Sequence, residues 1–249
     1  MNSRRKFIQK SVLGAAALGA GIPKISSAGN KPVEKKKYPP LKLGLMTYNL
    51  GKEWDIETII KNCSQTGWVH VELRTTHAHG VEVSLNKQER AEVKKRFEDS
   101  PMEAISLASA FRYHYADQDE LKKNIEGTKE YLQLAADVGA LGIRVFPNQF
   151  VEGVDREKTL EQIGKALAEV GEFGHNVGVD VRVCVHGKGT DEIPVIKKIL
   201  DYSGSDHVYV NWNCSENDVK GKGLEYNFNS IKDKIRGIHM HELTSDYPY

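Results

Sequence analysis

Gly142-Ile143-Arg144-Val145-Phe146 is a short, mostly apolar run of the kind that forms a buried strand. Residues 155–175 follow it and carry apolar side chains at helical spacing, at Leu160, Ile163, Leu167 and Val170. Residues 179–185, Val-Asp-Val-Arg-Val-Cys-Val, then have the character of a strand again. A strand, a helix and a strand in this order form a βαβ unit, so the stretch predicts two parallel strands joined by a helix.

The same alternation extends along the chain on both sides of this unit. Asp55 is the expected N-cap of one helix and Gly67 its end, while Asp117 and Glu120 have the spacing of a capping box. Further strands are expected at residues 43–48, 69–73, 104–108, 208–212 and 235–240. Further helices are expected at residues 55–67, 87–99, 117–139, 193–202 and 228–234.

Seven βα units in succession predict an α/β protein with a parallel (β/α)8 barrel, the TIM barrel. An open doubly wound sheet is the alternative, but it would be expected to carry a glycine-rich phosphate turn after its first strand. Residues 48–52, Tyr-Asn-Leu-Gly-Lys, contain no such turn. Since the sequence stops at Tyr249, we expect the barrel of residues 41–249 to be truncated after the seventh strand, without the eighth βα unit.

Residues 1–28 have the pattern of a twin-arginine export signal. Arg4 and Arg5 precede a weakly apolar stretch at residues 12–22, and Ser26-Ser27-Ala28 offers a cleavage site between small residues. A transmembrane anchor is the alternative, but this stretch is too short for a span of roughly 20 residues. We therefore expect cleavage after Ala28 and export to the periplasm, with no transmembrane segment in the mature chain.

The rest of the chain has the composition of one globular domain behind a tether. Residues 29–40 are rich in lysine and proline and are expected to form a flexible tether. Removal of residues 1–28, which hold five basic residues and no acidic one, changes the formal net charge from +1 to −4. A mildly acidic domain is a poor partner for nucleic acid. Three cysteines without a metal-binding spacing do not indicate a disulfide scaffold.

The polar residues that follow the expected strands predict where the chemistry lies, because a βα barrel carries its active site at the carboxyl ends of its strands. Six of the nine histidines fall at this end, and such clustering suits proton transfer or metal binding. These histidines are His77, His79, His114, His186, His239 and His241.

Individual candidates each have a structural alternative. Glu72 lies inside an apolar run, where a charge is costly unless it is functional or paired, for which Arg74 and Arg144 are the expected partners. His239 alternates with Ile238 and Met240, so it faces the barrel interior if they face the helices. The loop histidines 77 and 79 are alternatively solvent-facing, and a buried apolar thiol is the ordinary role of Cys184.

The chain resembles the xylose isomerase-like TIM barrels, the sugar phosphate isomerase/epimerase superfamily, over about residues 41–249. The resemblance is carried by residues 43–45 (Leu-Gly-Leu), 71–74 (Val-Glu-Leu-Arg), 184–187 (Cys-Val-His-Gly) and 238–243 (Ile-His-Met-His-Glu-Leu). It implies one divalent metal held by Glu, Asp, His and Glu of strands five to eight, and proton transfer through an enediol. At the first three of these ligand positions the sequence has Cys184, Asn213 and His239. The fourth ligand position, on strand eight, lies beyond Tyr249.

The resemblance implies a sugar or sugar phosphate isomerase or epimerase that transfers a proton with metal assistance on a ketose- or aldose-type substrate. A non-catalytic relative that binds carbohydrate through a degraded metal site is the alternative, while a DNA-repair endonuclease of the superfamily would need more metal ligands and a basic groove. The expected cofactor is a weakly held Mn²⁺, Mg²⁺ or Zn²⁺, because Cys and Asn make a softer and less charged site. The expected partner is a small carbohydrate, and the sequence is compatible with an oligomer.

The resulting site hypothesis assigns three roles. The expected catalytic residues are Glu72 and His186. The expected metal ligands are His239, Asn213 and Cys184. The expected substrate-binding residues are His77, His79, Arg144, His241 and Glu242.

Overall fold

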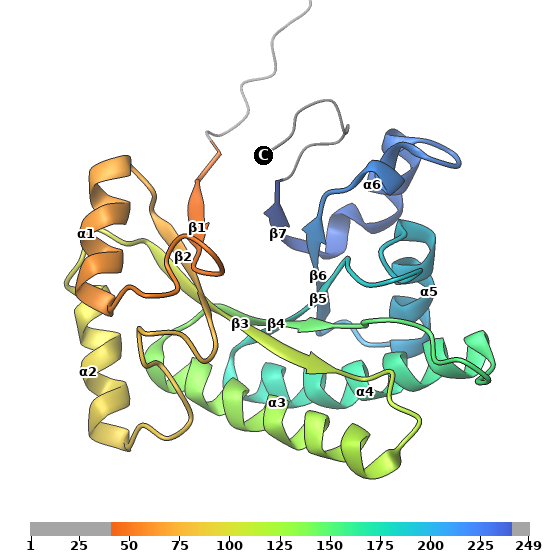
Figure 1. Ribbon diagram of the computed structural model, residues 1–249, viewed down its shortest axis with the longest axis horizontal. Coiled ribbons are helices and arrows are strands. Elements are labelled where there is room, and N and C mark those ends of the chain that lie inside the picture. Colours follow the sequence, from red (N-terminus) through yellow and green to blue (C-terminus); the bar gives the residue numbers. More distant parts are fainter. Residues whose placement is uncertain (1–40, 241–249) are drawn as a thin grey trace, which may run out of the picture. The chain divides into compact units, whose positions relative to one another are not determined.

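The computed structural model describes residues 41–240, which form one compact unit built around a parallel sheet. Within these residues the sheet has seven strands in sequential order, and it curls with the helices on its outer side (Figure 1). The strands are β1 (Gly44–Met46), β2 (His70–Arg74), β3 (Ala104–Arg112), β4 (Gly142–Phe146), β5 (Asp180–Cys184), β6 (Val208–Asn213) and β7 (Ile235–His239). The helices are α1 (Ile56–Thr66), α2 (Lys87–Glu98), α3 (Gln118–Val138), α4 (Arg156–Val177), α5 (Ile193–Ser203) and α6 (Leu224–Ile231).

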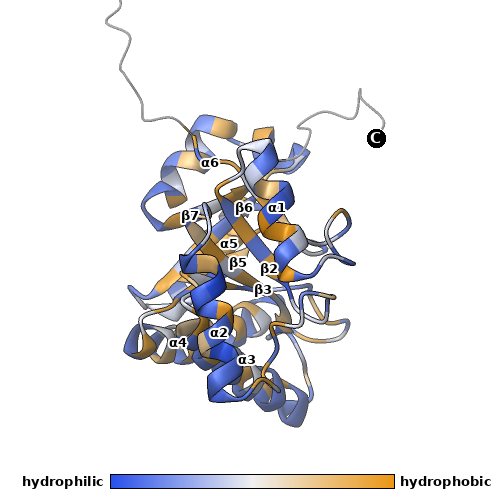
Figure 2. Cartoon of the chain, turned by 90° about the vertical axis from the view of Figure 1, so that its left-hand side faces the viewer, coloured by the Kyte–Doolittle hydropathy of each residue, from blue (hydrophilic) through white to orange (hydrophobic). Residues whose placement is uncertain are grey.

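The alternation of side chains along each strand divides the sheet into two faces. The apolar residues of one face are buried against the helices, as Val71, Leu73, Ile143, Val145, Val181 and Val183 show. Figure 2 shows these apolar strands inside, with hydrophilic residues on the outer helix surfaces. The alternate residues of β2, β4 and β5 include Glu72, Arg144 and Arg182, so the concave face of the sheet is polar.

The α/β barrel fold predicted from the sequence is confirmed by this curled parallel sheet. Among residues 41–240, β1 and β7 are the two edge strands and have no ladder between them. The expected signal at residues 1–28 and tether at residues 29–40 lie outside the described residues. A search of the described helices for one long and apolar enough to span a membrane finds none.

The ends of α1 and α3 can be compared with the capping residues that the sequence predicts. Asp55 caps α1 by accepting a hydrogen bond from the Thr58 amide at 2.8 Å, and Gly67 ends the helix with a φ of 73°. Asp117 caps α3 through the amides of Asp119 and Glu120. The predicted capping box is only half formed, because the Glu120 carboxylate turns to Lys123 at 3.5 Å instead.

Three predicted elements have different bounds in the structure. The first strand covers only Gly44–Met46 rather than residues 43–48. β3 continues past residue 108 to Arg112, because the strand shifts its register and pairs Arg112 with Phe146 of β4. The last helix covers Leu224–Ile231 rather than residues 228–234. It starts directly after Gly223, whose φ of 85° ends the preceding turn, and Asn227 anchors it by donating to the Asp218 carbonyl at 2.8 Å.

Candidate functional site

Glu72 is the centre of the polar interior. Its Oε2 atom lies 3.2 Å from Nε2 of His239, and its Oε1 atom lies 3.6 Å from Nε of Arg144. β2, β4 and β7 are not neighbours in the sheet, so these contacts cross the concave side of the curl. Together with Asn211, these residues form a group that we call the Glu72 cluster: Glu72, Arg144, Asn211 and His239.

Electrostatics keep the Glu72 carboxylate ionised. Burial is the largest influence and on its own raises the pKa of Glu72. The hydrogen bond and charge of His239, followed by the charges of Arg144 and His70, together outweigh burial and hold the pKa below its usual value. The cluster therefore contains a buried anion at neutral pH, with an imidazole on one side and a guanidinium on the other.

Asn211 and Gly237 determine how His239 is held. The Asn211 Nδ2 atom lies 3.1 Å from Nε2 and 3.4 Å from Nδ1 of the His239 ring. Gly237 faces Asn211 across the β6–β7 ladder, where a Cβ atom would lie only 2.7 Å from the Asn211 Oδ1 atom. Asn213, the expected metal ligand, is the ladder partner of His239 on the neighbouring strand.

Cys184 lies at the end of β5 and is buried. Burial raises the pKa of its thiol to about 12, and the charge of Arg144 only partly offsets this. The thiol is therefore protonated at neutral pH when no metal is bound, which makes it a poor nucleophile. All three cysteines are free.

The donor set of the Glu72 cluster fits a divalent metal poorly. Among residues 41–240, no group of three or more His, Cys, Asp and Glu side chains is placed to hold a metal ion. Glu72 and His239 are two suitable donors, but Asn211 is neutral and Arg144 places a positive charge beside the carboxylate. His241 and Glu242, expected to bind substrate, lie outside the described residues.

The expected loop histidines have different surroundings. Both ring nitrogens of His79 are bonded within its own loop, to the Arg74 carbonyl at 2.8 Å and the Val81 amide at 3.0 Å. His79 is therefore placed to shape the loop, while the half-buried His77 lies 3.4 Å from the Thr47 hydroxyl. His186 is exposed and packs edge-on against Phe146, with ring centres 5.0 Å apart.

A second polar layer was missed by sequence reasoning. The Ser106 hydroxyl lies 3.0 Å from His70 Nε2 and 3.2 Å from Arg182 Nη1, and Arg182 pairs with Asp180 at 3.1 Å. The charge of His70 also acts on Glu72, so the two layers are coupled. The signal was present in β5, where Arg182 interrupts an apolar run as Glu72 does in β2.

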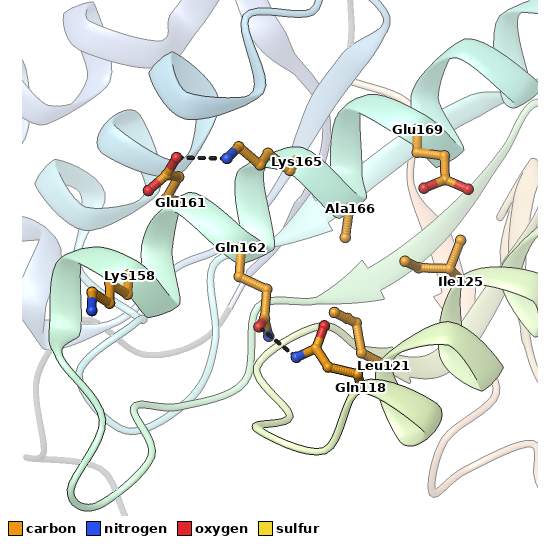
Figure 3. A pocket seen from close by; sticks show the side chains of 9 residues that line it. All are labelled: Gln118, Leu121, Ile125, Lys158, Glu161, Gln162, Lys165, Ala166 and Glu169. Atoms are coloured by element: carbon orange, nitrogen blue, oxygen red, sulfur yellow. Dashed lines mark hydrogen bonds and ion pairs between the residues drawn. The ribbon is translucent and has the colours of Figure 1, made fainter.

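A surface groove of about 330 Å³ lies elsewhere, between α3 and α4 (Figure 3). Its floor is apolar, and its rim carries an ion pair between Glu161 and Lys165 and a hydrogen bond between Gln118 and Gln162. None of the lining residues belongs to the Glu72 cluster. The groove is thus a feature of the outer helix layer, distinct from the polar strand face.

Comparison with known proteins agrees with the fold. The family model described as "Xylose isomerase-like TIM barrel" matches residues 60–246. A structure of L-ribulose 3-epimerase has a TM-score of 0.67 and 14% identity, over 80% of this chain and 69% of that one. The apo form of 3-keto-D-glucoside 4-epimerase YcjR from E. coli has a TM-score of 0.67 and 11% identity, over 82% and 80%.

A third similar structure contains a metal. The IOLI protein with a binding zinc atom has a TM-score of 0.63 and 14% identity, over 78% of this chain and 70% of that one. A search of curated protein sequences finds no match. At such identities the structural likeness establishes the fold, and the chemistry must be argued from the residues of this chain.

Proposed function

This chain belongs to the xylose isomerase-like TIM barrel family, and we propose that it is a sugar isomerase or epimerase that transfers a proton on a ketose- or aldose-type substrate. The observation that carries the proposal is the ionised, buried Glu72 hydrogen-bonded to His239 at 3.2 Å. A carboxylate and an imidazole in contact are suited to general acid–base chemistry. Solved structures of similar fold include sugar epimerases, which supports the same class of substrate.

The proton transfer needs a base, and the pair of Glu72 and His239 supplies it. The His239 side chain is 18% exposed and that of Glu72 is 11% exposed, so the imidazole is the more accessible partner. Breaking the C–H bond next to the substrate carbonyl passes the proton to the pair and leaves the electron pair on an enediolate. Return of the proton to the neighbouring carbon, with transfer of the hydroxyl proton from one enediolate oxygen to the other, gives the isomer. Delivery of a proton to the opposite face of the original carbon gives the epimer.

Arg144 supplies positive charge where the enediolate forms. Its Nε atom lies 3.6 Å from Glu72, and its guanidinium carbon lies 4.5 Å from the centre of the Phe146 ring. A guanidinium fixed in a poorly solvated interior stabilises negative charge that develops during the reaction. His186, whose ring packs edge-on with Phe146, is the proposed second proton-transfer residue.

A divalent cation, which the family resemblance implies, is proposed to bind weakly at this place. When bound, it would polarise the substrate carbonyl. Glu72 and His239 are the described residues that would hold it, but the Arg144 charge opposes a second cation there. No proton-transfer step above depends on it.

The alternative function is carbohydrate binding without catalysis. Cys184 favours it, because the family resemblance places a glutamate there, whereas this chain has a buried thiol whose pKa is raised by burial. The two functions differ in whether the substrate is converted.

The test is to incubate the full chain with a panel of ketoses and aldoses and to separate the products by chromatography. Formation of a new isomer or epimer, lost in His239→Asn but kept in His175→Asn, supports the enzyme. His175 is a matched control because it is an exposed histidine that stacks on His207, at a ring distance of 3.8 Å. Binding of a sugar without conversion of any panel member favours the alternative.

A further inference from the structure

Three arginines lie on the neighbouring strands β2, β3 and β4, and we call Arg74, Arg112 and Arg144 the arginine cluster. Arg74 ends β2, Arg112 ends β3 and Arg144 is the middle residue of β4. Arg74 is the ladder partner of Ala108, and Ala108 is the ladder partner of Arg144. The two arginines therefore share a row on one face of the sheet, two strand spacings or about 10 Å apart, with only a methyl group between them. Arg112 lies further along β3, opposite Phe146.

These positive charges are poorly compensated. Arg144 faces Glu72, but within residues 41–240 neither Arg74 nor Arg112 lies within ion-pair distance of a carboxylate. Arg74 instead donates from Nη1 to the carbonyl and hydroxyl of Thr75, at 3.0 and 2.6 Å. Glu82 is the acidic residue that acts on Arg74, and its carboxylate is already bonded to the Thr76 amide and the Tyr131 hydroxyl.

The charges of the cluster act on one another and on nearby histidines. Burial and then the charge of Arg144 lower the pKa of Arg74, and Arg112 contributes in the same direction. Burial and Arg112 lower the pKa of His114, while burial and Arg74 lower the pKa of His77. The two histidines are therefore neutral donors or acceptors beside a positive patch. The buried Nδ1 atom of His114 has no hydrogen-bond partner in the described part of the chain.

The positive charges of Arg74 and Arg144 repel one another across this face of the sheet. Guanidinium groups bind carboxylate and phosphate oxygens through paired hydrogen bonds. We propose that the arginine cluster recognises an anionic group of the substrate, the carboxylate of a sugar acid or the phosphate of a sugar phosphate. This inference rests on the proposed function, because it names the substrate class of the same site.

Arg144 connects recognition with chemistry, because it belongs to both the arginine cluster and the Glu72 cluster. An anionic group held by Arg74 and Arg112 leaves the polyhydroxy part of the ligand to extend past Arg144 toward Glu72 and His239. The Phe146 ring, which covers Arg144, gives the carbon chain an apolar surface between the two. Arg74 and Arg112 thus determine specificity, while the Glu72 cluster transfers the proton.

The test measures the affinity of the full chain for D-glucuronate, D-glucose 6-phosphate and D-glucose by calorimetry at low salt. We expect at least one anionic probe to bind ten-fold or more tightly than D-glucose. Arg74→Gln and Arg112→Gln should each reduce the ratio of anionic-probe affinity to D-glucose affinity by most of that factor. Arg96→Gln is the control, because Arg96 is an exposed arginine of α2 that pairs with Glu92 at 3.1 Å, and it should change nothing.

Comparison of the two anionic probes identifies whether carboxylate or phosphate is preferred. Equal binding of all three probes, or an anion preference that survives both arginine variants, overturns the inference. Conversion of neutral sugars without any anion preference would overturn the inference alone and leave the proposed function standing. An arginine-dependent anion preference without conversion of any sugar would leave anion recognition standing and overturn the proposed function.

Discussion

At the scale of single residues, Glu72 shows how far an isolated charge can be interpreted from sequence. An acid inside an apolar strand is costly, so the sequence predicts either a functional role or an ion pair. The structure has contacts that fit an ion pair and contacts that fit a functional role. Glu72 faces Arg144, one of its two expected ion-pair partners, and it also contacts His239. The position of His239, 167 residues further along the chain, followed from strand alternation, but its contact with Glu72 did not.

Glu72→Gln should destabilise the protein in a pH-dependent way. The folded-state pKa of Glu72 is lowered, so its stabilising charge is present at pH 7 and is lost as the pH falls through that lowered pKa. Removing one member of a buried ion pair costs about 3 kcal/mol, which sets the expected loss at pH 7. Thermal melts from pH 7 to pH 3 should show the gap between wild type and variant closing in acid. Glu98→Gln, at an exposed position of α2, should show no comparable gap, and a gap that widens in acid would contradict this account.

Metal binding gives a second prediction at this scale. Calorimetric titration with Mn²⁺, Zn²⁺ and Mg²⁺ should give weak binding, because Arg144 opposes a cation at Glu72 and, among residues 41–240, no group of three His, Cys, Asp or Glu side chains is placed to hold one. His239→Ala should weaken the binding further. Tight Mg²⁺ binding that persists in His239→Ala would place the metal elsewhere.

At the scale of secondary-structure elements, the predicted strands and helices follow from local sequence patterns. Errors arise where pairing with a neighbouring strand determines the length or register of a strand. β3 extends because Arg112 finds a partner in β4, which no local pattern shows. The β6–β7 ladder changes register between Val210 and Asn211. The Asn211 amide contacts the His239 ring across this ladder, which strand alternation alone does not predict.

Gly237→Ala tests the close approach of β6 and β7. The new Cβ would lie 2.7 Å from the Asn211 Oδ1 atom, so the amide must move and its bond to His239 is disturbed. We expect a loss of about 1–3 kcal/mol in the free energy of unfolding, the usual cost of overpacking. The double variant with Asn211→Ser should recover part of the loss in denaturant melts. Additive losses in the double variant would show that the two residues do not interact.

At the scale of the whole molecule, the barrel class was predictable because strand and helix patterns alternate along the chain. The contacts of the Glu72 cluster were not predictable, because they join strands that only the curl of the sheet brings together. In the second polar layer, His70 and Ser106 lie on the neighbouring strands β2 and β3, while Arg182 reaches Ser106 from β5 across β4. Polar residues on the concave face were thus visible in the sequence, but their partners depended on the tertiary fold.

Export is a prediction about the complete chain. We propose that residues 1–28 direct it through the twin-arginine route and are cleaved after Ala28, because Arg4 and Arg5 precede a short apolar stretch. Replacing both arginines by lysine should keep the protein in the cytoplasmic fraction, while Lys10→Arg should leave export intact. Unchanged periplasmic delivery of the double variant would refute the assignment.

The central claim is that the Glu72–His239 pair transfers a proton, and deuterium uptake from D2O measures this most directly. The full chain would be incubated in D2O with D-fructose, D-tagatose, L-ribulose and ketose-type sugar acids, and the C–H signals next to the carbonyl followed by proton NMR. The account predicts deuterium uptake into at least one substrate, slowed about 100-fold or more by Glu72→Gln and by His239→Asn and unaffected by His175→Asn. Uptake that proceeds at the wild-type rate in both variants, or sugar binding without any uptake, would contradict it.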